Sequence, residues 1–279
     1  MIQDFLHTWP LFAHTYLTGW LLAVLLSLMG VYVVARDQIF VGAAIAQAST
    51  LGIALSMVAA SCLSAFHLHA LEFGATTWAV VFACLAAYVM SLAFGRRESH
   101  EAVAAWIFLA GGSLSVLVVA HSPHGLDEIQ RLVSSSLIGA TAQDTVLFAL
   151  LTSLTILFLY RYHRTITLLA VDPPMAAATG LPLRRWTTGL ALWLGLAVGC
   201  SIRSAGLLYT FGSLVLPALT AKALAREIRP LFLLAPLLAL LTAGAGFILA
   251  HHFDFPPAQA TVGLQVAVLA VCWLIRRAK

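Results

Sequence analysis

Apolar runs recur along the whole of this chain, and each is close to the roughly 20 residues that a helix needs to cross a bilayer's hydrocarbon core of about 30 Å. Hydrophobic residues make up 61% of the 279 residues, and charged residues only 9%. The connections between the runs are too short to form a soluble domain. The sequence therefore predicts an all-α, polytopic integral membrane protein, with residues 1–279 as a single transmembrane domain.

Charged and turn-forming residues divide the runs into predicted crossings. Pro217 should kink or end its helix, and Gly195 and Gly199 are expected to allow close helix packing. The sixth crossing is short and could form a hairpin or a broken element with the seventh, so eight crossings are an alternative to nine. The nine predicted crossings are 16–35, 38–60, 74–94, 102–120, 144–160, 187–202, 205–222, 231–250 and 260–275.

The distribution of Lys and Arg predicts the orientation, because cytoplasmic loops carry an excess of both. With the N-terminus outside and the C-terminus in the cytoplasm, all but two of the fifteen basic residues fall inside. The two outer ones, Arg131 and Arg203, are either interfacial residues or contacts for acidic groups on a binding protein. The net charge of +4 is thus a topology signal, and no nucleic-acid partner is expected.

Most of the histidines fall on the predicted outer side, among them His251 and His252, which lie close to Asp254. Imidazole and carboxylate groups bind transition metals, so these three residues are candidate metal ligands. The alternative is an ordinary interfacial turn, stiffened by Pro256 and Pro257.

The predicted membrane interior lacks ionisable side chains near the middle of every crossing. This argues against a carrier driven by protons or sodium through an intramembrane carboxylate. The HExxH, GxSxG and Walker A patterns are also absent, so no enzyme is expected, and ATP with Mg²⁺ would be bound by a partner ATPase rather than as a cofactor of this chain. A path would be lined by neutral side chains, and the candidates are Gln47, Ser49, Thr50, Thr210 and Ser213.

The stretch LLAVDPPMAAATGLPLRR, residues 168–185, interrupts the apolar pattern on the predicted cytoplasmic side, within a segment of about 165–186. Asp172 is a favourable N-cap, and Pro173 suits the first helical position. Gly180 is a natural residue to end the helix, and Pro182 prevents its continuation. We expect a helix of about two turns over 173–179, either a reversing connector or a contact for a partner.

Five segments in chain order resemble the permease subunits of bacterial zinc, manganese and iron(II) ABC transporters, over about residues 17–276. The resemblance implies two permease copies that form the path, two cytoplasmic ATPase subunits, and a periplasmic or lipid-anchored metal-binding protein that delivers the cargo. It also implies a multi-pass location in the lipid of the bacterial inner membrane. The segments are ARDQIFVGAAIAQASTLGIAL (35–55), about 129–144, LAVDPPMAAATGLPLRR (169–185), IRSAGLLYTFGSLVLPALTAKALA (202–225) and FDFPPAQATVGL (253–264).

Two of these segments bear directly on function. The 169–185 segment resembles the family's ATPase-contacting helix, which implies a coupling role for Asp172, Pro173, Met175, Ala176 and Gly180. The 35–55 segment departs from the family, because Ala43 and Gln47 stand where the family has Asp and His. The implied cargo is zinc, manganese or iron. The alternatives are a chelate of the siderophore or cobalamin kind, or a membrane channel or scaffold that works without an ATPase.

Overall fold

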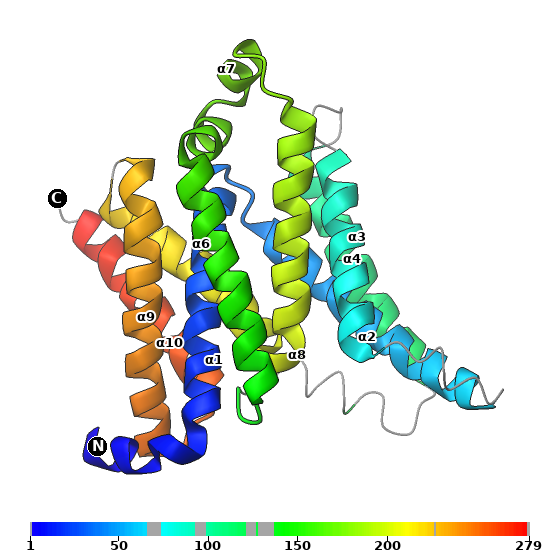
Figure 1. Ribbon diagram of the computed structural model, residues 1–279, viewed down its shortest axis with the longest axis vertical. Coiled ribbons are helices and arrows are strands. Elements are labelled where there is room, and N and C mark those ends of the chain that lie inside the picture. Colours follow the sequence, from blue (N-terminus) through cyan, green and yellow to red (C-terminus); the bar gives the residue numbers. More distant parts are fainter. Residues whose placement is uncertain are drawn as a thin grey trace. The chain divides into compact units, whose positions relative to one another are not determined.

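The computed structural model describes residues 2–65, 74–92, 99–120, 127, 137–225 and 227–277, with side chains from residue 12 onward except those of 60–65. These residues form helices and no strand, which confirms the all-α prediction. The helices are α1 (Ile2–Ala35), α2 (Phe40–Ala65), α3 (Ala75–Leu92), α4 (His100–Val119), α6 (Ala142–Val171), α7 (Pro173–Ala178), α8 (Leu183–Leu224), α9 (Ile228–Phe253) and α10 (Pro257–Arg277) (Figure 1).

Eight helices in the described ranges are long and apolar enough to cross a membrane, all of them except α7. The 42-residue α8 covers both the sixth and the seventh predicted crossing. A straight helix of that length would extend about 63 Å, which is roughly twice the hydrocarbon thickness. It is broken at Gly206, where φ is 78° and ψ is 171°, a conformation essentially restricted to glycine. The helix continues through Pro217, so of the two predicted effects, a kink or an end, the end does not occur.

The chain divides into two compact units, each assembled from stretches that are separate in the sequence. Unit 1 contains Met1–Asp37, Ser136–Leu183 and Leu208–Lys279. Unit 2 contains Gln38–Ser135 and Arg184–Leu207. The boundary near Gly206 gives α8 a first arm (184–205) in unit 2 and a second arm (208–224) in unit 1. The single domain over 1–279 stays a prediction.

In unit 1, α1 packs against α6 and α9, and α9 packs against α10. The second arm of α8 lies along α1, where the Tyr209 hydroxyl donates a 2.8 Å hydrogen bond to the Gly19 carbonyl. Further along, a Cβ on Gly30 would lie only 1.7 Å from the carbonyl oxygen of Leu214. The residue numbers of the contacts rise together, so these two helices run parallel.

In unit 2, α2 packs against α3 and α4, and the first arm of α8 lies on α3. A Cβ on Gly195 would be 2.9 Å from the Ala83 carbonyl oxygen, and one on Gly199 would be 2.8 Å from the Val80 Cα. The two glycines therefore allow the helices to approach closely, as predicted. The residue numbers change in opposite directions, so the first arm is antiparallel to α3.

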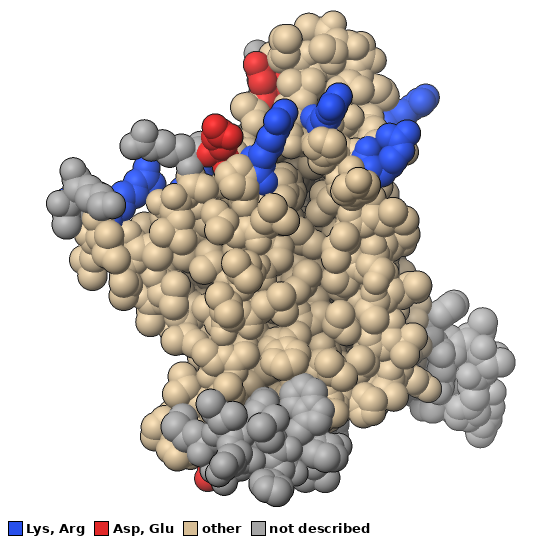
Figure 2. All heavy atoms as spheres, turned by 60° about the vertical axis from the view of Figure 1, so that its left-hand side comes forward, with Lys and Arg blue, Asp and Glu red and all other residues tan. Residues whose placement is uncertain are grey.

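In the described part of the chain, most charged side chains lie at or near the ends of helices. In unit 1 the described Lys and Arg residues lie at the ends of α1, α8 and α10, at the start of α9 and in the last third of α6. On the face drawn in Figure 2, no described Lys or Arg side chain interrupts the broad belt of uncharged residues. This distribution is typical of a membrane-spanning bundle. The assignment of the N-terminus to the outside and the C-terminus to the cytoplasm stays a prediction.

Candidate functional site

The helix predicted after Asp172 is present as α7, with the local structure that the sequence indicates. The Asp172 Oδ1 accepts a 2.9 Å hydrogen bond from the Met175 N–H, and Pro173 occupies the first turn. At the other end, Gly180 has a φ of 81°, and the Thr179 hydroxyl donates to the Ala176 carbonyl at 2.8 Å. Both ends of this six-residue helix are thus capped, which gives a short element a defined shape.

The exposure of α7 separates its residues into two groups. Ala176 is completely buried, and α7 contacts α6 in unit 1 (Figure 1). Asp172, Ala177 and Ala178 are exposed, and Met175 is 53% exposed. Ala176 therefore seats α7 on its own unit, and Met175 with its small neighbours is available to a partner.

Three of the predicted path residues lie on α2. Gln47 is half-buried beside α4, where a Cβ on Gly112 would lie 3.5 Å from the Gln47 Oε1. Ser49 is fully buried, and its hydroxyl has no hydrogen-bond partner in the part of the chain that the structure describes. The Thr50 hydroxyl donates to the Ala46 carbonyl at 3.0 Å. A buried hydroxyl without a partner costs free energy, so Ser49 stays a candidate path residue.

The other two predicted path residues, Thr210 and Ser213, lie on the second arm of α8 in unit 1. Both are fully buried, and the Thr210 hydroxyl has no hydrogen-bond partner among the described residues. Each of the two units thus contains a buried, unpaired hydroxyl at a position where the sequence predicts a path.

Gln265, in the middle of α10, was not among the predicted residues. It is only 2% exposed, and neither its amide oxygen nor its amide nitrogen has a hydrogen-bond partner within the described ranges. It borders a narrow gap in unit 1 together with Pro217 and Thr242. The one available signal was a lone Gln within the apolar run VGLQVAVL, and the same signal is given by a glutamine that merely packs.

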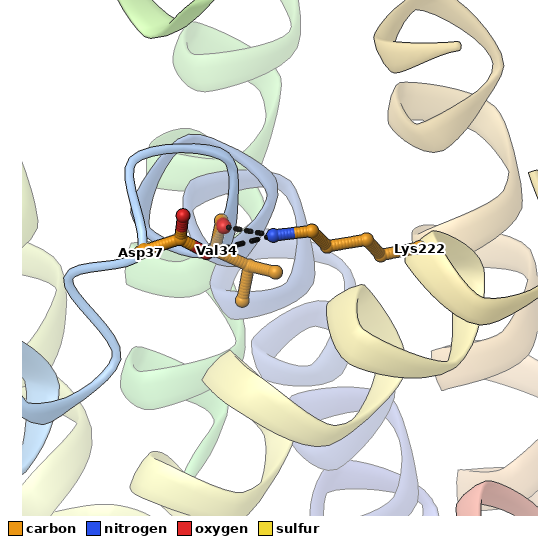
Figure 3. Close-up of polar contacts among 3 residues, drawn as sticks. All are labelled: Val34, Asp37 and Lys222. Carbon is orange, nitrogen blue, oxygen red and sulfur yellow. Dashed lines mark hydrogen bonds and ion pairs between the residues drawn. The ribbon is translucent and has the colours of Figure 1, made fainter. Parts of the chain in front are cut away.

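An ion pair joins the ends of α1 and the second arm of α8 (Figure 3). The Lys222 Nζ lies 2.8 Å from the Asp37 Oδ1 and donates a 3.2 Å hydrogen bond to the Val34 carbonyl. Asp37 has a φ of 53°, in the left-handed region where a helix commonly ends. Lys222 therefore binds both the carboxylate and a terminal carbonyl of α1.

The predicted docking residues are described only in part. Arg203 is exposed at the end of the first arm of α8, and its guanidinium donates a 2.7 Å hydrogen bond to the Thr76 hydroxyl of α3. Arg131 lies outside the described residues. Arg203 is thus held by its own unit and still faces solvent.

The candidate metal ligands lie at the end of α9 and in the following turn. His251 and Asp254 line one cavity of about 180 Å³ in unit 1. His252 is exposed, does not line this cavity, and packs its ring against Phe253, with 4.8 Å between ring centroids. Over the described ranges, no three His, Cys, Asp or Glu side chains gather closely enough to hold a metal ion.

Long apolar helices, a capped helix outside the membrane spans and neutral polar groups buried within the bundle define a membrane-spanning transport subunit. Residues 9–276 match the ABC 3 transport family, and the chain belongs to this family. It is a transport component rather than an enzyme, in the bacterial inner membrane. The resemblance to metal ABC permeases found in the sequence is thereby confirmed.

The curated relatives have low sequence identity to this chain but align with most of its length. The manganese import system permease protein ScaB of Streptococcus gordonii is 20% identical over 278 residues, which cover 99% of this chain and 96% of that protein. The manganese transport system membrane protein MntC of Halalkalibacterium halodurans is 21% identical over 254 residues, or 91% of this chain and 83% of that protein.

Two solved structures share the fold. PsaBC from Streptococcus pneumoniae, in complex with Fab, has a TM-score of 0.81 and 17% identity, and the match covers 98% of this chain and 95% of that chain. An inward-facing metal-chelate type ABC transporter has a TM-score of 0.70 and 17% identity, with 93% and 84% covered. At such low identity these similarities show the fold alone.

Proposed function

We propose that this chain is the permease subunit of an ABC importer for a divalent transition metal ion, with manganese the first candidate and zinc and iron the others. Two copies form the path, a solute-binding protein delivers the ion, and a separate ATPase drives transport. The observation that carries the proposal is the family match over residues 9–276, together with manganese permeases that align over nearly the whole chain.

The proposed path residues support a weakly bound, oxygen-coordinated cargo. Where the family resemblance leads us to expect Asp and His, this chain has Ala43 and Gln47. In unit 2, Gln47 and Ser49 offer an amide and a hydroxyl without charge, and in unit 1, Thr210 offers a hydroxyl. Carbonyl-type oxygens and water suit manganese, whereas zinc prefers imidazole and thiolate ligands. A path of this kind favours manganese and allows it to leave readily.

The proposed contact with the ATPase is the exposed face of α7. Ala176 anchors the helix on unit 1, and the caps at Asp172 and Gly180 fix its ends. Met175 then presents an apolar side chain that is 53% exposed at the end of α6 where the bundle meets water. A partner that buries Met175 gains its hydrophobic free energy, and α7 transmits the partner's movement to α6 and α8, which flank it in the chain.

The proposed contacts with the delivery protein are Arg203 and Arg131. Arg203 keeps its charge exposed and is oriented by Thr76. A guanidinium of this kind favours an acidic partner surface and increases the rate of encounter.

Uptake of radioactive manganese, zinc and iron tests the cargo. The chain is expressed with its ATPase and delivery protein in a host that lacks its own manganese importer, and uptake of each ion is measured with and without this chain. We expect manganese uptake that needs both the chain and ATP. Uptake of a metal chelate but of no free ion would replace the proposed cargo, and uptake without the ATPase would show a channel.

Substitution of Met175 tests the coupling surface separately. Met175→Glu should abolish co-purification with the ATPase, because a charge would be buried at the contact. Met175→Leu keeps an apolar side chain of similar volume and should co-purify normally. Equal recovery of the ATPase with both variants would contradict the coupling role of α7.

A further inference from the structure

A cavity of about 180 Å³ opens at the end of unit 1 that is opposite the Asp37–Lys222 pair. It lies between the early part of α1 and the turn from α9 to α10. Its polar groups come from Thr15, Tyr16, His251 and Asp254, and aromatic rings such as Phe247 form much of the remaining wall. A water molecule's share of liquid volume is about 30 Å³, so the cavity has room for an ion that keeps part of its hydration shell.

Among the described residues of unit 1, no Lys or Arg lies beside the carboxylate of Asp254. Asp254 is exposed, its backbone has a φ of 54°, and its N–H donates to the Ala250 carbonyl. Its side chain has no ion pair or hydrogen bond among the described residues. The described Lys and Arg residues of unit 1 all lie toward the opposite ends of their helices. At this end of unit 1, Asp254 therefore attracts cations.

His251 lies three residues before Asp254 and lines the same cavity, so an imidazole and a carboxylate border one space. Thr15 and Tyr16 of α1 line the same cavity. Imidazole binds iron and zinc, and carboxylate and water bind manganese. With two strong ligands and no third His, Cys, Asp or Glu within reach in the described part of the chain, such a site binds weakly and exchanges its ion quickly.

We infer that His251 and Asp254 form an entry site that takes up a divalent metal ion, with water completing the coordination, before the ion enters the bundle. The role of the site in import rests on the proposed function. The binding of the ion by these two residues does not, and it is measured on the permease alone.

The test is Mn²⁺ titration of the purified permease in nanodiscs, followed by electron paramagnetic resonance, because the signal of free Mn²⁺ is lost on binding. We expect Asp254→Asn and His251→Gln each to weaken Mn²⁺ binding by about tenfold or more. His252→Gln is the matched control, because His252 is the neighbouring imidazole but does not line the cavity, and it should bind Mn²⁺ like the wild type. Asp254→Glu, which keeps the carboxylate, should restore binding in part.

Wild-type Mn²⁺ binding in both Asp254→Asn and His251→Gln would overturn the inference, as would an equal loss in His252→Gln. Elution of each variant as a single species with the wild-type melting temperature separates loss of the site from loss of the fold. Failure of this site with manganese uptake intact would leave the proposed function standing. Binding at this site without uptake of any ion would refute the proposed function alone.

Discussion

The contact between α1 and the second arm of α8 makes the strongest prediction, because at Gly30 two backbones meet. A Cβ on Gly30 would lie 1.7 Å from the Leu214 carbonyl oxygen, and such contacts are essentially never shorter than 3.0 Å. Gly30→Ala must therefore separate the two helices locally by at least about 1.3 Å, the difference between these distances. Overpacking usually costs about 1–3 kcal/mol. Because the atom that must move belongs to a backbone, we expect a cost near 3 kcal/mol.

The assay is thermal unfolding of the purified permease, followed by tryptophan fluorescence in one detergent. At roughly 2–4 °C per kcal/mol, Gly30→Ala should lower the melting temperature by about 6–12 °C. Gly189→Ala is the control: Gly189 lies in α8, is exposed, and has no atom within 4 Å of the added Cβ. Alanine there gains up to about 1 kcal/mol of helix propensity, so this variant should melt at or above the wild-type temperature.

Either of two melting results would contradict this prediction. A Gly30→Ala protein that melts with or above the wild type would show that α1 and the second arm of α8 do not meet at Leu214. A Gly189→Ala protein that is destabilised by as much as Gly30→Ala would show that any glycine lost from a helix has this effect.

Three further substitutions have expected outcomes. Gly206→Ala forces alanine into backbone angles essentially restricted to glycine, at a cost of about 1–3 kcal/mol, and should lower the melting temperature; an unchanged value would argue against the break in α8. Lys222→Met removes a pair whose side chains are 45% and 82% exposed, so calorimetry should show a loss below about 1 kcal/mol that shrinks further in salt; a large, salt-independent loss would contradict this. Asp172→Ala removes the cap of α7 at about 1 kcal/mol and should increase amide exchange at Met175, whereas unchanged exchange would show that the cap is dispensable.

The crossings could be predicted because each depends on local composition. The same is true of α7, whose caps at Asp172 and Gly180 are read from neighbouring residues. The break in α8 was placed within a few residues, since Arg203 interrupts the apolar run there. Pro217 was predicted to kink or end its helix, and the helix continues through it, because neighbouring groups in a bundle can satisfy the carbonyl that a proline leaves free.

Some residues of the candidate sites were also predicted from local sequence, and others were not. The neutral path residues were predicted because few polar side chains occur in the runs. Ser49 and Thr210 are buried and have no hydrogen-bond partner among the described residues, and their role in a path stays a prediction. Gln265 was not predicted, since a lone amide in an apolar run does not distinguish a functional glutamine from one that merely packs. The cavity shared by His251 and Tyr16 joins helices at distant places in the sequence, and only tertiary structure brings them together.

The parallel pairing of α1 with the second arm of α8 has a consequence for the order of synthesis. The hydrogen bond from Tyr209 to Gly19 spans 190 residues. At about 5–20 residues per second, α1 leaves the ribosome roughly 10–40 s before its neighbour exists. During that interval the glycine-bearing face of α1 has no partner from α8. A nascent chain arrested before residue 209 should therefore show α1 crosslinking to lipid or to the insertion machinery through the face that bears Gly30. In the finished protein, the α8 backbone occupies that face.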